Sequence, residues 1–259
     1  MPTADPIEKI TLNAKPSLVL FFVIDCSASM STGGRINSVN LAIREALPIV
    51  KSAGSANADV KIAVLTFSNG AKWMCNEPVA ANDFVWSDIS AGGYTDFGAA
   101  CDELCDMLSQ KKFITPDNGH KKPVIILLTD GLPTDVDVWP AALERLKANI
   151  WFKNSYKIAF AIDGADEDML LDFVGRPEGV RKIDDPQKLK EMLKGIAIAF
   201  VKIRSRSIPI DTNAAAGNRD KAAESGLHKT IGDTIEEVDN NYATGKTGSF
   251  GWDNSDDWD

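Results

Sequence analysis

Residues 18–30 read Leu-Val-Leu-Phe-Phe-Val-Ile-Asp-Cys-Ser-Ala-Ser-Met, and this stretch decides the fold. Its first seven residues are apolar and rich in β-branched and aromatic side chains, which is typical of a buried strand. The pattern D-x-S-x-S follows at once and supplies Asp25, Ser27 and Ser29. The acid and the two hydroxyls therefore leave the carboxyl end of a strand, which is the edge where open α/β sheets bind ligands.

Predicted strands and helices alternate through the first two hundred residues. Apolar runs predict further strands at 59–67, 124–128, 157–162 and 180–183, with 71–75 as a short antiparallel partner of 59–67. Apolar residues at helical spacing predict helices at 35–53, 100–108, 139–150, 169–174 and 186–203. Strands and helices alternating at this spacing form a mostly parallel sheet. We therefore predict a doubly wound, Rossmann-like α/β fold with helices on both faces of the sheet.

The composition changes after Ser207. Residues 211–259 hold eleven acidic residues against four Lys and Arg, so they carry −7 of the chain's net charge of −9. Large apolar residues are few there, which is typical of segments that bury too little surface to fold alone. We predict one domain at 1–207 and an acidic, mostly disordered tail at 208–259. Apolar spacing within the tail predicts an amphipathic helix at 227–242, which we expect to order only against a partner groove or a sister molecule.

Charge and composition narrow the classes of function. A net charge of −9 leaves no basic excess to neutralise phosphates, so we expect no nucleic-acid partner. No apolar run has the length of a membrane span, so we expect no membrane partner. The first fifteen residues lack the pattern of a signal peptide, and the four cysteines form no regular disulfide framework. Both observations predict a cytoplasmic protein.

The sequence offers little support for catalysis. Neither His120 nor His228 lies beside a serine or cysteine signature, so no catalytic triad is visible. The chain also lacks both the G-x-G-x-x-G and the Walker A phosphate-binding patterns. We therefore predict that the protein is not an enzyme.

Three segments at the predicted carboxyl edge supply oxygen ligands. They are the D-x-S-x-S loop with Asp25, Ser27 and Ser29, then Thr95 before a helix, then Asp130 after the strand 124–128. Carboxylates and hydroxyls are hard ligands, which suit Mg²⁺ or Mn²⁺ and not zinc. For any one of these residues alone, capping of a turn or helix is the simpler interpretation. For the five together we predict a Mg²⁺ site that also accepts Mn²⁺.

These five residues resemble the metal-ion-dependent adhesion site of the von Willebrand factor type A family. That site has the form D-x-S-x-S, then a Thr, then an Asp, and the resemblance covers about residues 16–204. Residues 127–135, followed by Trp139, are similar to the bacterial tellurium-resistance-associated branch of the family. The similarity implies a stress-response role beside a protein kinase and a metal-dependent protein phosphatase.

The resemblance also implies a role for each ligand. Ser27, Ser29 and Thr95 would bind the ion directly, whereas Asp25 and Asp130 would hold it mainly through water. The ion would then take a carboxylate from a partner protein at its open position. We therefore expect a Mg²⁺-dependent scaffold or adaptor in a signalling complex.

Two alternatives stay open, an adaptor for a ring ATPase and a metal-dependent hydrolase, the second of which needs a general base near the ion. The sequence leaves open the partner, the stimulus, the bound cation, the oligomeric state and phosphorylation of Thr230 or Thr234.

Overall fold

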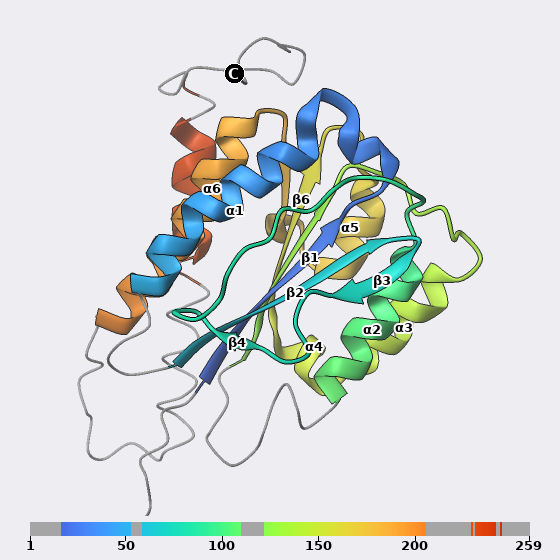
Figure 1. The fold of residues 1–259 in the computed structure, drawn as a ribbon, viewed down its shortest axis with the longest axis horizontal. Helices are drawn as coiled ribbons and strands as arrows, with labels where there is room; N and C mark the ends of the chain where they lie inside the picture. The colour runs from blue at the N-terminus through green and yellow to red at the C-terminus, as the bar shows by residue number, and fades with distance from the viewer. Residues whose placement is uncertain are drawn as a thin grey trace, which may run out of the picture.

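The computed structural model describes residues 17–52, 59–109, 122–205, 229, 231–241 and 244, which are built around one seven-stranded sheet (Figure 1). Its strands are β1 (Ser17–Asp25), β2 (Asp59–Ser68), β3 (Gly70–Trp73), β4 (Val79–Ala80), β5 (Val124–Thr129), β6 (Tyr156–Ile162) and β7 (Val180–Ile183). The order is β3-β2-β1-β5-β6-β7, with β4 also paired to β2. The strands from β2 to β7 in this order run parallel, and β3 and β4 are antiparallel to β2. The predicted mostly parallel sheet is confirmed.

Helices cover both faces of this sheet, as the alternating pattern predicted. They are η1 (Ala28–Gly34), α1 (Arg35–Ser52), α2 (Phe97–Ser109), α3 (Trp139–Ala148), α4 (Ile150–Asn154), α5 (Glu167–Val174), η3 (Pro177–Gly179) and α6 (Pro186–Ser205). Buried residues of α1 and α6 share one hydrophobic cluster with the sheet, and those of α2 to α5 share the other. The doubly wound α/β fold is therefore confirmed.

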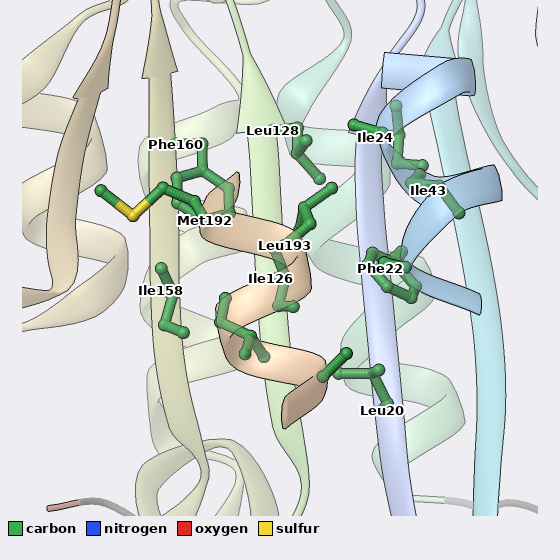
Figure 2. Packing of buried hydrophobic residues seen from close by; sticks show 14 of the residues in the cluster. Leu20, Phe22, Ile24, Ile43, Ile126, Leu128, Ile158, Phe160, Met192 and Leu193 are labelled. Atoms are coloured by element: carbon green, nitrogen blue, oxygen red, sulfur yellow. The ribbon is translucent and has the colours of Figure 1, made fainter. Parts of the chain in front are cut away.

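The central strand β1 shows why the apolar run in the sequence needs two covered faces. All nine of its residues are buried. Successive side chains of a strand point to opposite faces, so alternate residues of β1 enter different clusters. Leu20, Phe22 and Ile24 lie with Met192 and Leu193 of α6, as Figure 2 shows, and the residues between them face α2 to α5.

One predicted element divides in two. The sequence pattern predicted a single helix over 139–150, whereas the structure ends α3 at Ala148 and begins α4 at Ile150. Asn149 between them has an extended backbone, and its side chain accepts hydrogen bonds from the amides of Trp151 and Phe152. Asn is a favourable N-cap residue, so this side chain starts a new helix where the apolar periodicity alone suggested continuation.

The C-terminal helix, residues 231–241, lies beside α6 (Figure 1). The apolar spacing predicted a helix at 227–242, which we expected to order only against a partner groove or a sister molecule. Instead, Ile231 and Ile235 are buried in the cluster formed with α1 and α6. Gly195 of α6 permits the close approach, because a Cβ atom there would lie 2.9 Å from the Thr234 methyl group. The division of the chain at residue 207 stays a prediction, and apart from Lys229, 231–241 and Thr244 the predicted tail, Thr230 included, lies outside the described residues.

The burial of Ile235 makes the C-terminal helix a contributor to stability. We expect Ile235→Ala to lower the free energy of unfolding by about 2–4 kcal/mol, the usual cost of truncating a buried isoleucine. Chemical denaturation of the full chain measures this loss. The neighbouring Glu236 is exposed, so Glu236→Ala is the matched control and should change stability little. Equal stability of the two variants would contradict the burial of this helix face.

Lys157 at the start of β6 makes a pH-dependent contribution to the free energy of unfolding. Burial and the positive charge of Arg176 lower the pKa of Lys157 to about 8. Below pH 8 the lysine is charged in both the folded and unfolded states, and the folded state bears the desolvation penalty. As the pH rises from about 8 to 10.5, the unfolded chain holds the extra proton, so the folded state gains stability.

We therefore expect Lys157→Met to raise the free energy of unfolding at pH 7 by about 1–2 kcal/mol, after allowance for solvent screening. The Phe152 carbonyl that accepts from Lys157 also accepts from Ser155, so the variant leaves it satisfied. At pH 10 the variant should exceed the parent chain in free energy of unfolding by less than it does at pH 7. Urea denaturation at both pH values tests this, and an advantage that grows with pH would contradict it.

In the described part of the chain, no helix has both the length and the apolar character that a bilayer crossing requires.

Candidate metal centre

The structure brings the five predicted ligands together at the carboxyl edge of the sheet. Asp25 ends β1 and Asp130 follows β5, which is the parallel neighbour of β1, so the two acids leave the sheet side by side. Ser27 and Ser29 lie at the start of η1, and Thr95 lies just before α2. All five are buried except Ser29, which is half-buried.

Gly131 marks the point on which the three segments converge. A Cβ atom at Gly131 would lie 3.6 Å from both Ser29 Oγ and Thr95 Oγ1, and 3.8 Å from Asp25 Oδ2. One oxygen thus comes from each of β1, η1 and the segment before α2. The missing side chain leaves a small space bordered by these oxygens.

The spacing of the hydroxyls fits an octahedral ion. Oxygens bound to Mg²⁺ at about 2.0–2.1 Å on adjacent corners of an octahedron lie about 2.9 Å apart. Ser27 Oγ and Ser29 Oγ are 3.0 Å apart, and a hydrogen bond joins them. The two serine oxygens therefore already have the separation of neighbouring Mg²⁺ ligands, and the residues present fit the ion.

Asp25 is held by two donors that fix its orientation. The Ser27 amide donates to Oδ1 at 2.8 Å, and the Thr129 hydroxyl donates to Oδ2 at 2.5 Å. Burial raises the pKa of the Asp25 carboxyl; these hydrogen bonds oppose the rise, and the nearby charge of Asp130 adds to it. Thr129 was not predicted as part of the site, although it lies directly before Asp130.

Asp130 is shared between a serine and an arginine. Its Oδ1 accepts from Ser29 Oγ at 2.7 Å, and its Oδ2 accepts from Arg35 Nη1 at 2.8 Å. Arg35 also donates through Nη2 to Asp163 Oδ2 at 2.8 Å. The guanidinium therefore offsets part of the negative charge beside the site. Arg35 was not predicted from the sequence, where the available signal was a cation at the start of a helix that follows the D-x-S-x-S loop.

Thr95 is positioned by the loop that follows Asp130. Its amide donates to Thr134 Oγ1 at 3.1 Å, and the Thr134 amide donates to the Thr95 carbonyl at 2.9 Å. Asp135 then accepts from the amides of Phe97 and Gly98 at the start of α2. Thr134 and Asp135 thus join two of the three loops that form the site.

The side chains present at the site also limit which kind of metal centre it can form. Across the described ranges, no three His, Cys, Asp or Glu side chains gather as a metal-binding group. The site is instead built from three hydroxyls and two carboxylates. The chain's two histidines, His120 and His228, both lie outside the described residues.

Residues 20–132 match the family model of the von Willebrand factor type A domain. This region of the chain is therefore similar to that family. The matched region begins in β1 and ends just after Asp130, so it includes all five candidate ligands. No curated protein sequence matches the chain.

Solved structures of low sequence identity share the fold of this chain. One is a von Willebrand factor type A protein from Catenulispora acidiphila, with a TM-score of 0.51, 18% identity, and coverage of 72% of this chain and 43% of the other. The pilus adhesin SpaC from Lactobacillus rhamnosus GG has a TM-score of 0.57 and 18% identity over 73% of this chain and 31% of its own.

The ArnB paralog VWA2 from Sulfolobus acidocaldarius has a TM-score of 0.52 and 19% identity over 70% of this chain and 45% of its own. The chain thus spans less than half the length of each of these three proteins. At these identities the similarity establishes the fold and not the activity. The link to the tellurium-resistance branch stays a prediction.

Proposed function

We propose that this chain is a type A domain that serves as a Mg²⁺-dependent protein-binding module and is not an enzyme. The observation that carries the proposal is the convergence of Ser29 Oγ, Thr95 Oγ1 and Asp25 Oδ2 around Gly131. In this proposal Ser27, Ser29 and Thr95 bind the ion directly, whereas Asp25 and Asp130 hold it mainly through water. Mn²⁺ would bind at the same ligands.

The charge of the donor set supports binding of an anionic partner group. The three hydroxyls are neutral, and the charge of Asp130 is partly balanced by Arg35. A bound divalent ion would therefore keep much of its positive charge. An anion from outside is the natural ligand for such an ion, and a carboxylate of a protein partner supplies one. The name of one structural neighbour, a pilus adhesin, is consistent with a binding role.

The proposed cellular setting extends the resemblance described above. We propose a cytoplasmic scaffold or adaptor in a bacterial stress-response complex of the tellurium-resistance type, with a protein kinase and a metal-dependent protein phosphatase as candidate partners. Affinity capture from the native host, with and without Mg²⁺, identifies the partner and separates this role from that of a ring-ATPase adaptor.

The test of the mechanism is the dependence of partner binding on the ion. We expect a captured native partner to bind at least tenfold more weakly in EDTA, a loss of about 1.4 kcal/mol. Restoring Mg²⁺ or Mn²⁺ should restore binding, since chelation does not alter the protein covalently. Equal binding with and without EDTA would show that the ion does not mediate docking.

A further inference from the structure

Exposed apolar side chains occur in the two loops that border the metal centre. Among the described residues, eight large hydrophobic side chains are exposed, and four of these belong to the two loops that border the site. The four are Tyr94, Leu132, Val136 and Val138, with exposed fractions of 72%, 64%, 63% and 52%. We call this group the apolar rim. Scattered exposed residues need no explanation, but a group beside a polar site is typical of a binding surface.

Hydrogen bonds hold the two loops of the apolar rim together. The paired contacts between Thr95 and Thr134 join the segment after Tyr94 to the segment between Leu132 and Val136. Gly131, on which the candidate ligands converge, directly precedes Leu132. A ligand that reaches the ion with a carboxylate therefore meets apolar side chains close by. The fitting ligand combines acids with large apolar residues.

The chain carries such a segment itself. Residues 250–259 read Phe-Gly-Trp-Asp-Asn-Ser-Asp-Asp-Trp-Asp. Four carboxylates and three aromatic rings within ten residues supply both kinds of contact that the site and the apolar rim require. This segment lies outside the described residues.

The C-terminal helix directs the chain toward the edge that holds the site. A Cβ atom at Gly232 would lie 3.9 Å from the hydroxyl of Tyr156, the first residue of β6. At the other end, Asp239 pairs with Arg181 of β7 at 3.4 Å and with Lys188 in the first turn of α6 at 3.1 Å. Because α6 begins just after β7 ends, the helix runs from the amino edge of the sheet to its carboxyl edge.

The remaining distance is short enough for the same chain to cover. β5, which precedes Asp130, lies two strands from β7, or about 10 Å at the usual strand spacing. The eight residues from Thr244 to Trp252 span up to about 26–29 Å when extended. The chain after Thr244 is therefore long enough to cross from β7 to β5 within its own molecule.

We propose that residues 250–259 bind in cis to the metal centre. An aspartate of the segment completes the coordination of the ion, and a tryptophan contacts the apolar rim. The segment thereby competes with an external partner for the same position. This inference rests on the proposed function, since it assigns an internal ligand to the proposed ion site.

A labelled peptide with the sequence of residues 248–259, blocked at both ends, tests the proposal. It is titrated in Mn²⁺ against the full chain and against a tail variant of the full chain. The tail variant carries Trp252→Ser, Trp258→Ser, Asp253→Asn, Asp256→Asn, Asp257→Asn and Asp259→Asn. We expect the tail variant to bind the peptide at least tenfold more tightly, because its own segment no longer competes. EDTA should abolish peptide binding to both proteins.

The apolar rim is tested in the background of the tail variant. Leu132→Ser should weaken peptide binding at least threefold. Ile150→Ser is the matched control, since Ile150 is equally exposed at 64% but begins α4, away from the two loops. It should leave peptide binding unchanged.

The outcomes separate this inference from the proposed function. If the tail variant binds Mn²⁺ but not the peptide, residues 250–259 are not a ligand of the site. The proposed metal site is then still supported. Equal peptide affinity of the parent chain and the tail variant also overturns binding in cis. If neither protein binds Mn²⁺, the ion site fails, and the internal ligand fails with it.

Discussion

Replacing Ser27 and Ser29 together with alanine should abolish detectable Mn²⁺ binding while leaving the fold intact. The two hydroxyls are 3.0 Å apart, as neighbouring ligands of an octahedral ion are, and their loss removes two of the three proposed direct ligands. The effect should exceed a hundredfold in affinity, or about 2.7 kcal/mol. Electron paramagnetic resonance of free Mn²⁺ during a titration measures the affinity.

Ser31 provides the matched control for this double variant. It lies in the same η1 segment, is exposed, and donates its hydroxyl to the Ala28 carbonyl at 2.7 Å, away from the five candidate ligands. Ser31→Ala should therefore bind Mn²⁺ as the parent chain does. Undiminished binding by the double variant would remove the serines from the site and place the ion elsewhere.

Gly131→Ala should weaken Mn²⁺ binding at least tenfold without destabilising the domain. The added methyl group would lie within 3.8 Å of Ser29 Oγ, Thr95 Oγ1 and Asp25 Oδ2, in space that water or a ligand of the ion needs. These distances are ordinary van der Waals contacts, and Gly131 lacks the positive φ that disfavours alanine. Isothermal titration with Mn²⁺ and a thermal melt measure the two quantities separately.

Gly92 in the segment before Thr95 is the control for added volume. A Cβ atom there would meet no heavy atom within 4 Å, and its φ is also outside the left-handed region. Gly92→Ala should keep the parent affinity. If Gly131→Ala binds Mn²⁺ normally in a folded protein, the ion does not lie where the three oxygens converge.

The serines and Gly131 differ in how far the sequence alone predicted their roles. The serines were predicted as ligands from the D-x-S-x-S pattern, because their spacing from Asp25 is local and follows a recognisable buried strand. Gly131 directly follows a predicted ligand but received no role. Its importance depends on the approach of Thr95 and Ser29 from two other loops, which a local pattern does not report.

The sequence by itself determined the layered α/β fold, the central strand β1 and the edge of the sheet that holds the candidate ligands. These features depend on local periodicity and on the order of apolar runs, and both can be inspected along the chain. The same periodicity predicted a helix at 227–242, and residues 231–241 are helical in the structure. The periodicity did not predict where this helix packs. Ile231 and Ile235 need an apolar surface, and periodicity does not say whether α6 or another molecule supplies that surface.

The tertiary structure alone decided the contacts that join distant segments. Arg35 links Asp130 to Asp163, and Thr129 orients Asp25 across 104 positions of the sequence. A hydrogen bond depends on a few ångströms of distance and on its angle. Those quantities follow from how β1, β5 and β6 align in the sheet, so no pattern within one segment determines them.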